Sequence, residues 1–190
     1  MRIISGTARG TKLYTLNGDS TRPTLDRVKE SIFNIIQKNI LDSALLDLFA
    51  GSGAIGLEAA SRGAKKVILC DKSKDAINII NKNIEKTHLK EKVEVYNQDY
   101  EQCLEKVSQY KFDLIYLDPP YEFNMWKELL NKIIEKKLIT DETIIIIETD
   151  NKERVINQLK ETKIEITSQK KYGRAEIIFL KYKVLQDRKG

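Results

Sequence analysis

Five short apolar runs alternate with segments of helical spacing, and this alternation constrains the fold more than any other feature of the chain. The expected strands cover Ala44–Ala50, Lys66–Cys70, Lys92–Tyr96, Phe112–Leu117 and Thr143–Glu148. The expected helices that follow them cover Ala54–Arg62, Lys74–Lys86, Glu101–Ser108, Asn124–Lys136 and Lys152–Leu159. Strand and helix in regular succession are typical of a parallel sheet with right-handed crossovers. We therefore predict a doubly wound α/β fold with helices on both faces.

The two ends of the chain depart from this alternation. Near the C-terminus, Lys163–Thr167 and Ala175–Tyr182 predict a hairpin that turns near Tyr172-Gly173-Arg174. The last strand then runs antiparallel in a mixed sheet of about seven strands. Near the N-terminus, residues 2–10 predict a short strand and turn, and Thr24 is expected to cap a helix over Leu25–Lys38. We expect one domain over 1–190, with an N-terminal extension over 1–40 and a core over 41–185.

The composition excludes several classes of protein. A chain of 190 residues buries a sizeable core without disulfides or structural metal. Cys70 and Cys103 give neither a disulfide framework nor a metal-ligand spacing, so we expect both to be reduced and no metal to be bound. No apolar stretch approaches the roughly 18 residues of a membrane span, and no secretory signal is evident. These features indicate a cytoplasmic protein without a membrane partner.

The net charge of +5 is unevenly distributed. Residues 1–40 hold seven Lys and Arg against three Asp and Glu, and residues 168–190 hold seven against two. Residues 41–167 hold 19 against 23. Basic ends indicate a polyanionic partner such as nucleic acid, although basic termini can also serve only solubility. The candidate nucleic-acid contacts are Arg9, Lys12, Arg22, Thr24, Arg27, Lys29, Lys171 and Arg174.

A glycine-rich turn follows the first expected strand. Gly51, Gly53 and Gly56 form G-x-G-x-x-G between that strand and the next helix. Such glycines permit a tight turn and a close backbone approach, with the helix N-terminus facing the ligand. Asp71 closes the next strand about 20 residues further on, where an acidic side chain binds ribose hydroxyls. The sequence therefore predicts a Rossmann-like site for a nucleoside cofactor.

Two further carboxylates bear on which nucleoside is bound. A nicotinamide dehydrogenase has the same motif, but Asp47 beside the turn suits a cationic or amine-bearing ligand better than a pyrophosphate. The single histidine, His88, lies at the polar end of an expected helix and is not a good proton shuttle. Asp99 follows the third strand, where it could accept a hydrogen bond from an adenine amino group or cap the next helix.

Asp118-Pro119-Pro120-Tyr121 follows the fourth apolar run. Two prolines remove two backbone donors and fix two φ angles, which makes the tetrapeptide rigid. It presents a carboxylate, free carbonyls and an aromatic ring at the carboxyl edge of the sheet. Such a group could accept both N–H bonds of an exocyclic amine while the ring stacks on a base. The alternative is an ordinary turn with Tyr121 in the core.

Taken together, these motifs resemble those of the class I S-adenosylmethionine-dependent methyltransferases. The resemblance implies that S-adenosylmethionine is the cofactor, with its methionine portion along Asp47–Gly53, its ribose on Asp71 and its adenine on Asp99. The tetrapeptide resembles that of the subset that methylates exocyclic nitrogens of bases. The implied cofactor residues are Asp47, Phe49, Ala50, Gly51, Ser52, Gly53, Gly56, Asp71, Lys72, Asp99 and Tyr100.

The ends of the chain carry a closer resemblance. Residues 2–6 (Arg-Ile-Ile-Ser-Gly), Arg9-Gly10, residues 21–34 (from Thr-Arg-Pro-Thr to Ile-Phe-Asn) and Tyr172-Gly173-Arg174 are similar to the RsmD family. The resemblance runs from Met1 to about Tyr182. It implies methylation of guanine N2 in small-subunit (16S) ribosomal RNA, free or within a subunit or an assembly intermediate.

In this hypothesis Asp118 and the Pro119 carbonyl accept the two N–H bonds of the guanine amine, and Asp118 takes the lost proton. Tyr121 stacks on a base that has left its helix. The catalytic candidates are Asp118, Pro119, Pro120 and Tyr121. One alternative is a DNA adenine-N6 or cytosine-N4 methyltransferase, although such enzymes usually carry a recognition insertion for which this chain has no room. Another is a non-catalytic RNA-binding protein of ribosome assembly.

Overall fold

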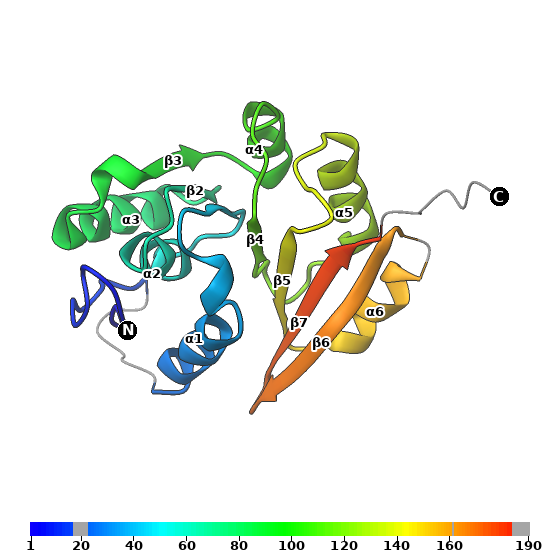
Figure 1. Cartoon of the computed structure of the whole chain (residues 1–190), viewed down its shortest axis with the longest axis horizontal. Coiled ribbons are helices and arrows are strands. Elements are labelled where there is room, and N and C mark those ends of the chain that lie inside the picture. Colours follow the sequence, from blue (N-terminus) through cyan, green and yellow to red (C-terminus); the bar gives the residue numbers. More distant parts are fainter. Residues whose placement is uncertain (17–22, 161, 184–190) are drawn as a thin grey trace.

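A mixed sheet forms the centre of the computed structural model, which describes residues 1–16, 23–160 and 162–183 (Figure 1). Within these ranges seven strands pair in the order β3-β2-β1-β4-β5-β7-β6. The strands are β1 Ala44–Asp47, β2 Lys66–Asp71, β3 Val93–Asn97, β4 Leu114–Leu117, β5 Ile144–Thr149, β6 Ile164–Tyr172 and β7 Ala175–Tyr182. The pairs among β1 to β5 are parallel, whereas β7 runs antiparallel to both β5 and β6. The predicted fold class is confirmed.

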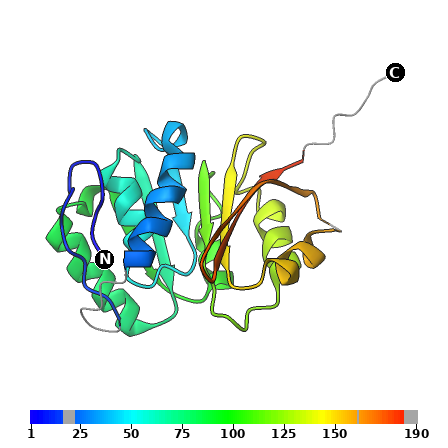
Figure 2. The ribbon, with the colours of Figure 1, turned by 90° about the horizontal axis from the view of Figure 1, so that it is seen from below.

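Helices cover both faces of the sheet because successive strand residues point to opposite sides. Leu45 of β1 packs into the core with α1, α2 and α3, whereas Leu46 packs into the core with α4, α5 and α6. Figure 2 shows the two layers of helices on either side of the strands. The helices are α1 Pro23–Ile35, α2 Ala54–Ser61, α3 Lys74–Thr87, α4 Tyr100–Lys106, α5 Trp126–Glu135 and α6 Lys152–Leu159, with short 3₁₀ turns at Gln37–Asn39 and Lys90–Lys92.

Close contact between α2 and β2 depends on Gly56. A Cβ atom at this position would lie 2.3 Å from Leu69 Cδ2 and 2.7 Å from Val67 Cγ1. The third glycine of the predicted motif therefore sets the distance between the helix and the sheet. This distance in turn fixes where the N-terminus of α2 lies relative to the carboxyl ends of the strands.

The first helix begins earlier than the sequence predicted. Proline at the first helical position costs nothing, because the N–H it lacks would be unpaired there and its φ is already helical. Helix α1 accordingly starts at Pro23 and ends at Ile35, with a separate 3₁₀ turn in place of the expected last turn. Thr24 is thus inside the helix, and its expected role as the N-cap is wrong.

The N-terminal segment folds back on itself and packs on α2. Arg2 and Lys12 form an antiparallel bridge, and Thr7 and Ala8 donate backbone hydrogen bonds to the carbonyl and hydroxyl of Ser61 at the end of that helix. The predicted turn is confirmed, whereas the predicted strand is reduced to this single bridge pair. Among the described residues, none of the helices is both long and apolar enough to cross a membrane.

Candidate functional site

The glycine-rich loop between β1 and α2 has the conformation that the motif predicts. Gly53 caps α2 with a φ of +77°, a left-handed conformation that a side chain would strain. At Gly51 an added Cβ would meet no atom within 4 Å, so the loop faces open space. A cavity of about 160 Å³ lies against this loop. Its lining includes Asp47, Phe49, Ala50, Gly51 and Ser52 from the predicted cofactor set.

Two predicted cofactor carboxylates, Asp71 and Asp99, lie near the carboxyl ends of β2 and β3, which are the next strands along the sheet from β1. Asp71 accepts hydrogen bonds from the backbone N–H groups of Gly51 (2.9 Å) and Ser73 (2.8 Å), so it fixes the loop against the end of β2. Each carboxylate oxygen retains a lone pair for a ligand hydroxyl. Asp99 caps α4 through the N–H of Gln102 at 2.8 Å and remains exposed. The predicted capping role of Asp99 is confirmed, and its second carboxylate oxygen accepts no hydrogen bond from any residue that the structure describes.

Asp47 is a buried carboxyl group at the end of β1. Desolvation raises its pKa to about 8, the charge of Asp71 adds to the shift, and a hydrogen bond from the Phe49 N–H opposes it. A buried carboxyl group with one weak backbone partner gains most from a cationic ligand. This environment fits the ammonium and sulfonium charges of S-adenosylmethionine.

The Asp118-Pro119-Pro120-Tyr121 segment borders a second, larger cavity of about 650 Å³. Tyr121 is 78% exposed, which excludes the alternative that it packs in the core. The Pro120 carbonyl closes a turn with the N–H of Phe123 at 2.8 Å, whereas the Pro119 carbonyl accepts no hydrogen bond from any described residue. Asp118 lines both cavities, so the segment stands where they meet.

Glu148, at the end of β5, is a site residue that the sequence reasoning missed. It lines both cavities with Asp118 and accepts a hydrogen bond from the hydroxyl of the buried Tyr116. Asp118 is exposed along the cavity wall, but protein atoms crowd its carboxyl group. This desolvation, followed by the charges of Glu148 and Asp47, raises the pKa of Asp118 above its usual range. Three carboxyl groups therefore meet at the ends of β1, β4 and β5.

A cluster of four aromatic rings runs between the linings of the two cavities, and only two of the four, Phe49 and Tyr100, were predicted as site residues. Phe49 and Tyr100 lie 5.7 Å apart between centroids, and Phe123 packs at 5.7 Å and 5.8 Å against them. Trp126 adds an edge contact of 5.0 Å to Phe123 and lines the larger cavity. Phe123 and Trp126 follow the predicted tetrapeptide within a few residues but do not belong to it, so the motif did not point to them.

The predicted nucleic-acid contacts fall into three groups. Arg9, Lys12, Arg27, Lys171 and Arg174 are exposed, and Arg174 borders the larger cavity at the β6–β7 turn. Arg22 lies outside the described residues. The backbone of Thr24 lies in α1, but its side chain is not described. The hydroxyls of Ser31 in α1 and Tyr172 in the hairpin share a hydrogen bond, so the two basic elements meet beside the cavity.

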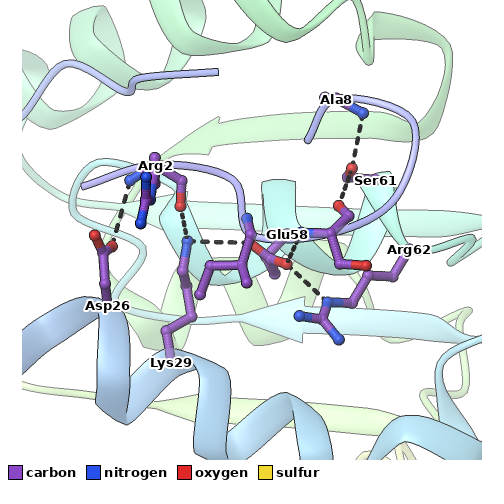
Figure 3. A network of polar contacts seen from close by, with 9 residues as sticks. Arg2, Ala8, Asp26, Lys29, Glu58, Ser61 and Arg62 are labelled. Atoms are coloured by element: carbon purple, nitrogen blue, oxygen red, sulfur yellow. Dashed lines mark hydrogen bonds and ion pairs between the residues drawn. The ribbon is translucent and has the colours of Figure 1, made fainter. Parts of the chain in front are cut away.

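Lys29 is not available to a phosphate, and its predicted role is wrong. Its side chain is 2% exposed, and its ammonium lies 3.1 Å from the fully buried Glu58. Figure 3 shows that the same carboxylate also forms an ion pair with Arg62, and that Lys29 donates a hydrogen bond to the Arg2 carbonyl. Burial lowers the pKa of Lys29, and the charge of Glu58 opposes that shift. Lys29 therefore ties α1 and the N-terminal segment to α2.

Comparison with solved structures places this site in a known fold. The structure of yhhF from Escherichia coli has a TM-score of 0.80 and 28% identity, and the match covers 97% of this chain and 98% of that chain. SMU.776, solved complexed with SAH, has a TM-score of 0.65 at 16% identity over 78% of this chain and 48% of that chain, and so shares the fold.

Comparison with sequences identifies the family. A protein of Haemophilus influenzae named Ribosomal RNA small subunit methyltransferase D is 38% identical over 179 residues, which cover 90% of this chain and 93% of that protein. The family described as Conserved hypothetical protein 95 matches residues 1–181. The chain therefore belongs to this family, the RsmD family of methyltransferases.

Proposed function

We propose that this protein transfers a methyl group from S-adenosylmethionine to the exocyclic N2 amine of a guanine in small-subunit ribosomal RNA, in the cytoplasm. The observation that carries the proposal is the position of Asp118, which borders both the cavity at the glycine-rich loop and the larger cavity beside Tyr121. A carboxylate in this position can hold an amine on one side while a methyl donor lies on the other. The name of the Haemophilus influenzae relative supports ribosomal RNA as the substrate.

The residues that line the smaller cavity, together with those at the carboxyl ends of β2 and β3, fit the cofactor. When bound there, S-adenosylmethionine supplies a methyl group that is already activated as a sulfonium. Asp47 would hold its methionine ammonium, Asp71 its ribose hydroxyls and Asp99 its adenine amine, with Phe49 and Tyr100 beside the ring. Because three carboxyl groups gather at this edge, a cation is stabilised there and in turn favours their charged forms.

The guanine amine is a weak nucleophile because its lone pair is delocalised into the ring. Asp118 and the Pro119 carbonyl would accept its two N–H bonds and so orient the lone pair toward the methyl group. Alignment of this kind supplies much of the rate in a transfer between two bound reactants. Asp118 would then accept the proton that the amine loses. Tyr121, being exposed, would stack on the flipped base, which is worth about 1–3 kcal/mol.

The basic residues on α1, the N-terminal turn and the hairpin tip would bind the RNA backbone. Arg174 borders the larger cavity, so a phosphate held there would lie near a base inside it. The exposed Arg9, Lys12, Arg27 and Lys171 extend this surface. Contacts with phosphates position the RNA, and contacts with the base edge select the nucleotide.

Substitution of Asp118 tests the proposal. Asp118→Ala should lower methyl transfer to small-subunit RNA by at least about 100-fold, the usual contribution of a positioned acid–base group, while cofactor binding stays nearly unchanged. Asp141→Ala, an exposed carboxylate in the turn before β5, is the matched control. Wild-type turnover in Asp118→Ala would rule out the amine clamp. Transfer to DNA but not to RNA would favour a DNA methyltransferase, and no transfer to either would favour an assembly protein.

A further inference from the structure

We propose that Glu148 recognises the N1–H group of the target guanine and thereby selects guanine over other 2-aminopurines. This inference rests on the proposed function, because it concerns the base that enters the larger cavity. Glu148 would act as a specificity-determining residue beside the amine clamp. It would not be needed to accept the proton from the amine.

The sheet places Glu148 beside Asp118. Strands β4 and β5 are parallel neighbours in which Leu117, the last residue of β4, pairs with Ile147, so the next residues of the two segments are Asp118, directly after β4, and Glu148, within β5. Residues at one level of neighbouring strands point to the same face, with their backbones about 4.8 Å apart. Both residues line both cavities. The two carboxylates therefore form an adjacent pair of acceptors at the cavity edge.

The surroundings of Glu148 leave it free to bind a donor. The hydroxyl of the buried Tyr116 donates a hydrogen bond to Glu148 Oε2, and this bond orients the carboxylate. The Oε1 atom accepts no hydrogen bond from any residue that the structure describes, and among those residues no Lys or Arg forms an ion pair with Glu148. A half-buried carboxylate with one hydroxyl partner and one open oxygen is an acceptor that lacks a donor.

Guanine has the matching pattern of hydrogen-bond donors. Its N1–H and its 2-amino group lie next to each other on one edge, so two adjacent carboxylates can accept from both. In 2-aminopurine the 2-amino group is kept, but N1 is unprotonated and presents a lone pair. That lone pair would face the Glu148 carboxylate and repel it. Because Glu148 would be enclosed by the analogue without receiving a donor, binding of such an analogue is strongly disfavoured.

The test compares two RNA substrates that differ only at the target base. One carries the guanosine that the wild-type protein methylates, and the other carries 2-aminopurine there. Wild type should favour guanosine in kcat/KM by at least about tenfold, as expected for one hydrogen bond to a charged group. Glu148→Gln should lose most of this preference, because its amide can donate to the unprotonated N1. Glu142→Gln, an exposed carboxylate just before the opposite end of β5, should keep it.

The ratio of kcat/KM on the guanosine RNA to kcat/KM on the 2-aminopurine RNA distinguishes a change of specificity from partial unfolding of the variant. Partial unfolding of a variant lowers both rates equally and leaves the ratio unchanged. An unchanged ratio in Glu148→Gln, with guanosine still methylated by the wild type, would overturn this inference alone. A wild-type protein that methylates neither RNA would overturn the proposed function as well.

Discussion

Replacing Lys29 by Met tests whether this residue is structural, as the ion pair indicates, or a phosphate ligand, as the sequence predicted. Met keeps most of the aliphatic volume of the lysine stem but removes its charge. Glu58, whose side chain has no exposed surface, would then lose the ammonium group that lies 3.1 Å away. It would keep Arg62 at 2.7 Å and the backbone N–H groups of Ile4 and Ser5 at 2.8 and 3.0 Å.

The size of the effect follows from these partners. Removing one member of a buried ion pair costs about 3–5 kcal/mol because the other charge is left uncompensated. The remaining partners of Glu58 place the expected loss at the lower end, about 3 kcal/mol. For a chain of this length each kcal/mol lowers Tm by about 2–4 °C, so Tm should fall by roughly 6–12 °C.

Urea unfolding of four proteins measures this cost: wild type, Lys29→Met, Lys29→Met with Glu58→Gln, and Lys66→Met. The double variant should regain part of the loss because no uncompensated carboxylate remains. Lys66 forms a half-exposed ion pair with Glu94 at 2.8 Å. Lys66→Met should therefore lower the free energy of unfolding by less than about 1 kcal/mol. The salt dependence of RNA binding should be unaltered in Lys29→Met. A loss below about 1 kcal/mol, or a shallower salt slope, would refute the structural assignment.

Two further perturbations test the electrostatics of the site. Because the pKa of Asp47 is raised from 3.8 to about 8, the unfolded chain ionises first, and the wild-type free energy of unfolding should fall between pH 4 and 8. Asp47→Asn should flatten this fall in urea titrations across that range, and an identical slope would contradict the burial. Changing Arg9, Lys12, Lys171 and Arg174 to Gln should make the logarithmic salt slope of RNA binding shallower by about 0.7 for each phosphate that the variant no longer neutralises, and an unchanged slope would exclude this surface.

Much of the fold could be predicted because local patterns decide it. Each buried strand is a continuous apolar run, and β4 is buried at all four positions because helices cover both faces. Element boundaries were less certain. Strand β6 extends to Tyr172, five residues beyond the expected Thr167, because its polar second half pairs with β7. Pairing of this kind depends on the partner strand and leaves no mark in the hydropathy of β6.

The error at Lys29 had a signal that was overlooked. Lys29 lies four residues before Phe33 and seven before Ile36, so helical spacing already places it on the buried face of that segment. Arg27 lies on the other side of the helix and is exposed. What the sequence could not supply was the partner, because Glu58 comes from a different helix and only the packing of α1 on α2 brings them together.

Glu148 and Asp118 differ in how readily the sequence reveals them. The proline pair after Asp118 marks a rigid loop, whereas Glu148 ends an isoleucine run that reads only as a buried strand. Its importance comes from register, since the pairing of Leu117 with Ile147 sets the two carboxylates side by side. Tyr116, two residues before Asp118, then orients Glu148 across the strands.

The uneven distribution of charge along the chain corresponds to two different surroundings in the structure. Acidic groups from the middle of the sequence line the cavities, where cations and N–H donors are to be bound, whereas Arg9, Lys12, Arg27 and Lys171 from the basic ends are exposed, where phosphates can reach them. A single net charge of +5 conceals this separation, which is why the distribution carries more information about function than the total does.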